Sequence, residues 1–247
     1  MIAIVSSSHY SDDERIYQRQ ICTLVEHGYN LIYYTKSSDS ANLSNDRLIH
    51  LNFDKNMSTK DFINEIVKDL LKRNSISHLQ IHETELLILL KIVKRKMNNI
   101  FTIYDIHENM NALYRTFSKR SFLIKELAIL KRNYDEIKML KFVDQIILAN
   151  PPIKKLSYHK LNIPILVLEN YVEKKYLIKK PLLNDNLNLI YHGHLGAERG
   201  IEDLVLAMEK IVQKYPDIKL LLLGSFRTKQ FENKIKKLIV KLLLGNN

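Results

Sequence analysis

The feature that most constrains the fold of this chain is the alternation of short apolar runs with stretches of helical periodicity. Between the apolar runs, apolar residues recur every three or four positions, as they do on one face of a helix. Strands that alternate with helices form right-handed crossovers and a parallel sheet covered on both faces. The sequence therefore predicts an α/β fold, with strands at residues 1–5, 31–34, 47–53, 77–82, 100–106, 143–149 and 165–168.

Local signals predict where helices begin and how long they run. Ser11 and Glu14 have the spacing of a capping box, which places a helix start between them. Asp13 and Arg15 are expected to form a structural pair at the same helix start. Apolar residues continue at helical spacing over residues 113–141, which predicts one long helix there.

The alternation pauses at residues 173–186, which are polar and rich in lysine. Such a composition is typical of a linker. The pattern then restarts, with predicted strands at residues 187–192 and 218–223, each followed by a predicted helix. We therefore expect a complete Rossmann-like domain at residues 1–172 and an incomplete second one at residues 187–247.

The composition narrows the class of protein. With 46% hydrophobic and 26% charged residues, the 247-residue chain is globular rather than disordered. Its longest apolar run is far too short to span a bilayer, and its start does not have the pattern of a signal peptide. Cys22 is the single cysteine, which excludes an internal disulfide and fits a reducing compartment. We expect a cytoplasmic protein.

The net charge of +11 points to an anionic partner. Nucleic acid, an anionic membrane and an anionic substrate would each account for it. The sequence has no nucleic-acid-binding motif and no arginine-rich tract, so we expect no nucleic acid partner. Residues 115–141 mix cations with apolar side chains, as surfaces that contact anionic lipid do. A core helix with a solvated basic face explains the same residues.

The most specific segment, residues 191–200, lies between a predicted strand and a predicted helix and reads Tyr-His-Gly-His-Leu-Gly-Ala-Glu-Arg-Gly. Gly193 and Gly200 allow the backbone to approach a ligand closely. The helix that follows presents unpaired N–H groups and the positive end of its dipole, which suit a diphosphate. Arg199 adds a cation that can bind phosphate oxygens. The alternative is an ordinary strand-to-helix turn with a surface arginine.

Two histidines, His9 and His107, each follow a predicted strand. Ligand-binding loops gather at the carboxyl ends of parallel strands, so both are candidate site residues. Glu108 follows directly and has two interpretations, as a partner of His107 or as a cap of the next helix. No group of His, Cys and Asp has the spacing of metal ligands along the chain, so we expect no metal.

Taken together, these segments resemble the retaining family 4 glycosyltransferases of GT-B architecture. The resemblance covers nearly the whole chain in the correct order. It rests on residues 9–16, on Tyr104-Asp105-Ile106-His107-Glu108, on residues 143–150 with 167–170, and on the glycine loop followed by Gly224.

The resemblance implies a GT-B fold with an acceptor-side first domain and a nucleotide-sugar-binding second domain. It implies that His107 is catalytic, that His9 and Glu108 lie on the acceptor side, and that the loop with Gly193, His194, Arg199 and Gly200 binds the donor diphosphate. His194 stands where the family commonly has arginine. The reaction implied is transfer of a sugar from a nucleotide-diphosphate donor to a glycan or lipid-linked acceptor, with retention and without a further cofactor.

A complete family member continues beyond Gly224 and carries a Glu-x7-Glu segment that this sequence lacks. From this we expect a C-terminally truncated protein that transfers sugar weakly or not at all unless a second polypeptide completes it. Two alternatives remain: a non-catalytic remnant or half enzyme that binds a partner chain, and a sugar-nucleotide epimerase of the same architecture. Lipid-linked acceptors would place the protein peripherally at the inner membrane face.

Overall fold

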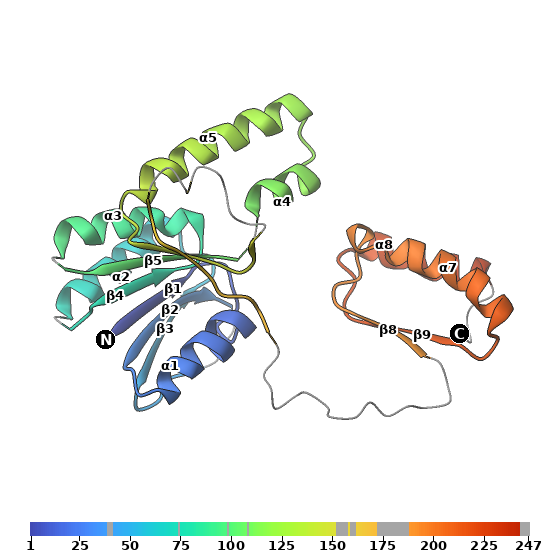
Figure 1. Ribbon diagram of the computed structural model, residues 1–247, viewed down its shortest axis with the longest axis horizontal. Coiled ribbons are helices and arrows are strands. Elements are labelled where there is room, and N and C mark those ends of the chain that lie inside the picture. Colours follow the sequence, from blue (N-terminus) through green and yellow to red (C-terminus); the bar gives the residue numbers. More distant parts are fainter. Residues whose placement is uncertain are drawn as a thin grey trace. The chain divides into compact units, whose positions relative to one another are not determined.

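The computed structural model describes residues 1–38, 42–73, 75–97, 99–107, 109–151, 158, 162–171 and 188–242. The chain divides into two compact units, Met1–Val172 and Glu173–Asn247 (Figure 1). The predicted linker, residues 173–186, lies outside the described residues. No helix within the described ranges combines the length and the apolar composition needed to cross a membrane.

The first unit is built on seven parallel strands in the order β3-β2-β1-β4-β5-β6-β7 (Figure 1). From β1 the chain first adds strands on one side and then crosses back to add β4 on the other side of β1. This reversal is a topological switch point, where open α/β sheets bind their ligands. The strands are β1 (Ile2–Ser6), β2 (Leu31–Ser37), β3 (Leu48–Asp54), β4 (His78–Ile81), β5 (Phe101–Ile106), β6 (Gln145–Leu148) and β7 (Ile165–Val167).

Helices cover both faces of this sheet, as the period of two along β1 requires. Ala3 and Val5 belong to a core that includes side chains of α2 (Thr59–Lys72) and α3 (Leu87–Lys96). Ile4 points to the other face and packs with Ile16 and Ile21 of η1 (Glu14–Ile21). A 3₁₀ turn, η2 (Thr84–Leu86), precedes α3, and α1 (Cys22–Glu26) continues η1. The prediction of an α/β fold with a two-sided parallel sheet is confirmed.

The first helix starts later than the capping box predicts. Asp13, not Ser11, is the N-cap, and its carboxylate accepts the backbone N–H groups of Arg15 and Ile16. Ser11 is buried instead, and its hydroxyl contacts Thr35 at 3.1 Å. The segment then winds as a π-helix before it becomes α-helical. The predicted cap was wrong because Ser11 and Asp13 can both accept helix N–H groups. Ser11 is buried beside Thr35, so Asp13 takes the N-cap position.

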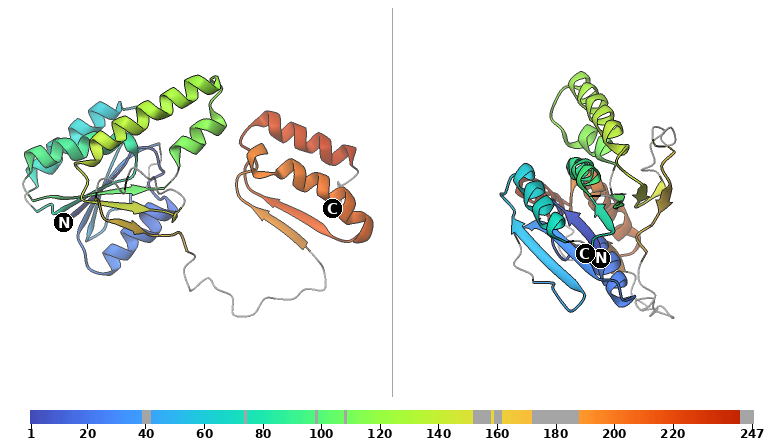
Figure 2. Two further views of the ribbon diagram at one scale, coloured as in Figure 1. Left: turned by 45° about the horizontal axis from the view of Figure 1, so that its top comes forward. Right: turned by 90° about the vertical axis from the view of Figure 1, so that its left-hand side faces the viewer.

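The predicted long helix at residues 113–141 is two helices, α4 (Met110–Phe117) and α5 (Phe122–Leu140). The break falls on Ser-Lys-Arg-Ser, where Ser118 and Ser121 both take extended backbone angles. Polar residues interrupt the apolar period there, so nothing buries that turn. In both views of Figure 2 the green and yellow-green hairpin of α4 and α5 stands away from the sheet.

The second unit contains two parallel strands, β8 (Asn188–His192) and β9 (Lys219–Leu223). One face packs against α7 (Ile201–Lys214) and α8 (Lys229–Lys241) around Val205, Met208 and Ile235. Ile190, Leu221 and Leu223 are exposed on alternate positions of the same strands. The core described in this unit is therefore a single layer of side chains between the two-stranded sheet and the two helices.

Candidate functional site

The candidate site of the first unit lies at the carboxyl ends of the strands, at the switch point between β1 and β4. His9 follows β1, His82 and Glu83 follow β4, and His107 follows β5. All four side chains line one cavity of about 570 Å³, together with residues from η2 and α4. The two histidines predicted from sequence thus meet in one cavity because their strands run parallel and end at the same edge. Their rings are 5.1 Å apart between centroids.

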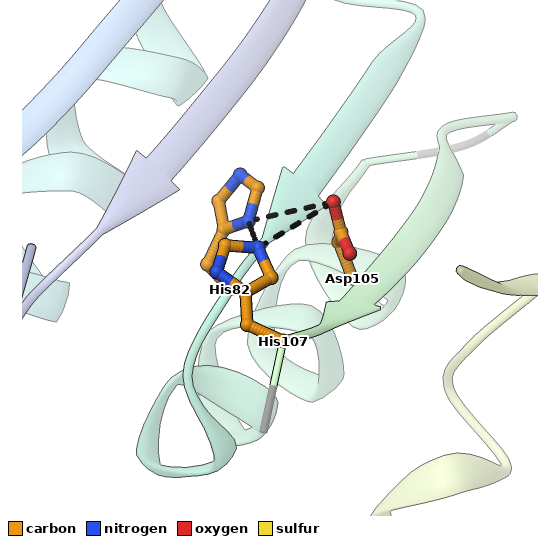
Figure 3. Close-up of side chains that lie close together, drawn as sticks. All are labelled: His82, Asp105 and His107. Carbon is orange, nitrogen blue, oxygen red and sulfur yellow. Dashed lines mark hydrogen bonds and ion pairs between the residues drawn. The ribbon is translucent and has the colours of Figure 1, made fainter. Parts of the chain in front are cut away.

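His107 forms a hydrogen-bonded pair with His82 (Figure 3). Nδ1 of His82 lies 2.8 Å from Nε2 of His107, a hydrogen-bond distance. Oδ2 of Asp105 lies 3.6 Å from that His107 nitrogen and 3.7 Å from Nδ1 of His82. The His82 and Asp105 side chains are fully buried, whereas the His107 side chain keeps 11% exposure toward the cavity.

Asp105 is the buried anion under the histidine pair. Its Oδ1 accepts a hydrogen bond of 2.9 Å from the Arg15 guanidinium, and its Oδ2 accepts one of 2.6 Å from Gln20. Burial by itself would raise the pKa of the Asp105 carboxyl. Its hydrogen bonds and the positive charge of Arg15 outweigh burial and hold that pKa below its usual range. Asp105 is therefore ionised at neutral pH.

Arg15 joins the helix of the first βα unit to the last strand of the sheet. Besides Asp105, its guanidinium donates to the backbone carbonyl of Leu168 and to the side chain of Asn170, both at 2.7 Å. Asp13 and Arg15 pair with each other only through the Arg15 backbone N–H, which donates to the Asp13 carboxylate. The Arg15 guanidinium instead reaches across 90 residues to the buried carboxylate of Asp105.

His82 is neutral at physiological pH. Burial lowers its pKa to about 3, since a charged imidazole would lose its hydration, and His107 and Arg15 add repulsion. Attraction to Asp105 opposes the shift without cancelling it. A neutral imidazole has one donor and one acceptor nitrogen, so His82 can pass a hydrogen bond along but adds no charge to the site.

His9 is held from two sides. Its Nδ1 lies 3.2 Å from Oδ2 of Asp13, and its Nε2 lies 3.9 Å from Oε1 of Glu83. Glu83 itself accepts hydrogen bonds from the hydroxyl groups of Ser6 and Ser8. Burial opposes ionisation of Asp13, but the His9 hydrogen bond and the helix N–H groups lower its pKa to about 2. His9 therefore faces two carboxyl groups, those of Asp13 and Glu83.

One group of described side chains has the geometry of possible metal ligands. His82, Asp105 and His107 offer ligand atoms that all lie within 4.8 Å of one another, although their spacing along the chain does not indicate this. Both oxygens of Asp105 already accept hydrogen bonds, from Arg15 and Gln20. The Arg15 guanidinium would also repel a metal cation. The arrangement favours a hydrogen-bonded histidine pair over a metal centre.

In the second unit, the glycine loop follows β8 and leads into α7. Gly193 has a φ of +140°, and its N–H donates to the Leu223 carbonyl at 2.9 Å. A Cβ on Gly224, where φ is +152°, would collide with the Gly193 carbonyl. The backbone at Gly193 therefore approaches the end of β9 closely. This contact requires glycine at position 224, and the positive φ favours glycine at both positions without any ligand.

The predicted diphosphate residues surround the start of α7. Arg199 ends a 3₁₀ turn, η5 (Ala197–Arg199), and its side chain is exposed. Gly200 is the N-cap with a φ of +68°, and no side chain among the described residues caps α7. His194 is exposed on the same loop. The first N–H groups of α7 are thus left to solvent or to a ligand. Glu202 in the first turn, which would oppose an anion, is paired with Lys234 at 2.6 Å.

Several residues of this site were not predicted from the sequence, and one predicted residue is not described by the structure. Glu108 lies outside the described residues. Asp105 stands within the segment that includes His107, but nothing local marked it as a buried anion. His82 is the last residue of the predicted strand at 77–82, and Glu83 follows it directly. Their place at a strand end is the local signal that could have indicated them.

Comparison with known proteins gives matches to solved structures only: no family model and no curated protein sequence matches this chain. One similar structure is sucrose-phosphate synthase of Thermosynechococcus elongatus. The similarity covers 100% of this chain and 69% of the synthase chain, with a TM-score of 0.66 and 18% sequence identity. A second is HepE of Anabaena in complex with UDP-glucose. The similarity covers 100% of this chain and 67% of the HepE chain, with a TM-score of 0.68 and 12% sequence identity. A third is trehalose-6-phosphate synthase OtsA. The similarity covers 98% of this chain and 70% of the OtsA chain, with a TM-score of 0.58 and 10% sequence identity.

These similarities show the fold. The chain has the architecture of the GT-B glycosyltransferases, with a complete first Rossmann-like unit and part of the second. In each comparison it spans about two thirds of the other protein.

Proposed function

We propose that this protein is a retaining, family 4 type glycosyltransferase that uses a nucleotide-diphosphate sugar and a glycan or lipid-linked acceptor. The observation that carries the proposal is the histidine-lined cavity at the switch point of a GT-B sheet. A similar fold in HepE holds UDP-glucose, which supports a nucleotide sugar as ligand. No further cofactor is part of this proposal.

The donor diphosphate would bind at the start of α7. The uncapped N–H groups there and the positive end of the helix dipole attract phosphate oxygens. Arg199 supplies a positive charge one residue before the N-cap, and Gly193, His194 and Gly200 shape the loop beside it. During transfer, negative charge builds on the departing diphosphate, so these groups would stabilise the transition state.

His107 would contact the reacting sugar, since it lines the cavity while a buried anion and a neutral histidine support it from behind. His9, whose ring lies beside that of His107 and between two carboxyl groups, would hold the acceptor. Glu108, predicted to act beside His107, remains part of this proposal without structural support.

The proposal is tested first by ligand binding. Isothermal titration of the full chain with UDP, GDP, ADP and their glucose derivatives is expected to give binding with at least one base, and weaker binding of the matching nucleoside. Arg199→Ala should weaken nucleoside diphosphate binding about tenfold or more, as expected for a hydrogen bond to a charged group. Lys210→Ala is the control, because this exposed cation lies on α7, roughly 15 Å from the start of that helix. Equal loss in both variants, or no binding at all, would contradict the proposed donor site.

Product analysis separates the alternatives, which no observation favours over transfer. A sugar-nucleotide epimerase would convert one nucleotide sugar into another without an acceptor, and a non-catalytic remnant would bind without turnover. Transfer of the sugar to an acceptor with release of the nucleoside diphosphate is the result expected from the proposal. Conversion without an acceptor, or binding without turnover, would contradict it.

Membrane contact is a further part of the proposed function, and the α4–α5 hairpin supports it. Phe122 and Leu123 are each 73% exposed and Leu127 is 66% exposed, although all three are large and apolar. Residues 110–141 carry eight lysines and arginines against three acidic residues. An apolar helix surface flanked by cations is suited to an anionic lipid surface. A peripheral location at the inner face of a membrane would bring the cavity near a lipid-linked acceptor.

Vesicle flotation tests this contact. The full chain should float with vesicles that contain phosphatidylglycerol and remain behind with pure phosphatidylcholine. Leu123→Ser with Leu127→Ser should abolish flotation. Val240→Ser is the control, because Val240 is equally exposed, at 73%, but lies on α8. Equal recovery with both vesicle types would remove the electrostatic part of the proposal, and unchanged flotation of the double variant would remove the hairpin from it.

A further inference from the structure

A continuous series of hydrogen bonds connects the buried carboxylate to the histidine pair by a second route. Asp105 accepts from Nε2 of Gln20 at 2.6 Å, and Oε1 of Gln20 accepts from Nε2 of Gln80 at 2.6 Å. The same Gln80 nitrogen lies 3.2 Å from Nε2 of His82, whose Nδ1 lies 2.8 Å from Nε2 of His107. The Gln80 and His82 side chains are buried in the sheet that carries them.

The direction of every hydrogen bond in this series follows from its first member. An ionised carboxylate only accepts, so Gln20 must turn its amide nitrogen to Asp105 and its oxygen to Gln80. Gln80 must then donate to Gln20, and the same NH₂ group has a second hydrogen for His82. Nε2 of His82 therefore accepts. Because His82 is neutral, its proton is on Nδ1, and this N–H donates to Nε2 of His107.

If the hydrogen bonds of this series ran in the opposite direction, two donors or two acceptors would face each other. If His107 donated to His82, Nε2 of His82 would carry hydrogen and face the NH₂ group of Gln80. Turning Gln80 over would relieve that contact but would set its oxygen against the oxygen of Gln20. Either mismatch leaves buried polar groups unsatisfied, which is costly. Asp105 does not offer a different route, since its distance of 3.6 Å to Nε2 of His107 is longer than a good hydrogen bond.

We propose that Gln20 and Gln80 are positioning residues that fix the tautomer of the neutral form of His107, with the proton on Nδ1. Nε2 of His107 is then engaged with His82, and the Nδ1–H group is the donor that His107 offers to an oxygen in the cavity. In Figure 3 the second ring nitrogen of His107 points away from Asp105. No hydrogen bond reaches this nitrogen from the residues that the structure describes. The role of that donor, contact with a sugar oxygen, rests on the proposed function, whereas the tautomer does not.

The tautomer is measured directly by long-range ¹H–¹⁵N correlation of the imidazoles in the ¹⁵N-labelled full chain at about pH 8. His107→Asn identifies the His107 signals by their disappearance. The wild-type protein is expected to show protonated Nδ1 and unprotonated Nε2 at His107. Gln20→Leu frees Gln80 to turn over, so the ratio of the two tautomers should shift at least about tenfold toward Nε2–H, a factor typical of one buried hydrogen bond.

Gln18→Leu is the matched control, because Gln18 lies on the same helix and is exposed; its tautomer ratio should equal that of the wild type. If Gln20→Leu does not fold, as its backbone amide spectrum would reveal, Gln80→Leu replaces it. Protonated Nε2 in the wild type would overturn the inference, and so would an unchanged ratio in the folded variant. Titration of the same samples with nucleoside diphosphates tests the proposed function separately, because the tautomer is read without any ligand.

Discussion

Acid should destabilise the first unit through His82. This imidazole is completely buried, and its pKa is lowered to about 3, whereas histidine in an unfolded chain titrates near 6.5. Between these two values the unfolded state binds a proton that the folded state does not. Stability therefore falls as the pH falls below about 6.5, and the loss stops growing only near pH 3.

The size of the effect follows from the width of that window. Between these two pKa values, the free energy of unfolding falls by about 1.4 kcal/mol for each pH unit. At pH 5 the loss due to His82 is therefore about 2 kcal/mol. A typical domain is stable by about 5–15 kcal/mol, which makes this a measurable share. Above pH 6.5 the contribution is absent, because His82 is neutral in both states.

The assay is urea unfolding at about pH 7.5 and about pH 5, followed by hydrogen exchange and mass spectrometry on peptides from β4 and β5. These peptides report the first unit separately from the second. In His82→Gln, the loss of stability between the two pH values should be smaller than in the wild type by about 2 kcal/mol. His27→Gln is the control, since His27 is exposed at the end of α1. An equal loss in wild type and His82→Gln would refute the reasoning, because His82 would then be protonated in the folded state.

Two further predictions concern stability. Arg15→Met leaves a buried carboxylate without its cation and should destabilise the first unit by about 3–5 kcal/mol in urea unfolding, whereas Arg19→Met, which breaks an ion pair nearer the surface, should cost at most about 1 kcal/mol. Gly224→Ala places a Cβ against the Gly193 carbonyl and should destabilise the second unit by at least about 3 kcal/mol, seen as faster hydrogen exchange in β8 and β9. Gly28→Ala, with open space around it and a φ of +85°, should cost only about 1–2 kcal/mol. Similar losses for either pair of variants would contradict the respective explanation.

The site was only partly predictable, for reasons that particular residues make clear. His9 and His107 were accessible to prediction, because each lies shortly after an apolar run and parallel strands end at a common edge. Asp105 lies in β5, and its importance comes from Arg15, which is 90 positions away. Nothing in the local sequence around either residue indicates that they meet. Glu83, by contrast, directly follows the predicted strand at 77–82, so its position at a strand end is visible in the sequence.

The local amino-acid pattern determined which segments of this protein are strands and helices, that the sheet is parallel and that helices cover both of its faces. These properties depend on residues a few positions apart, and burial of an apolar face enforces them. The order of the strands, with β4 beside β1 and β5 beside β4, was decided only by the tertiary structure. That order brings His82 to His107 and sets Asp105 beneath both. Contacts between distant residues depend on how whole elements pack, and periodicity along the chain carries no information about that.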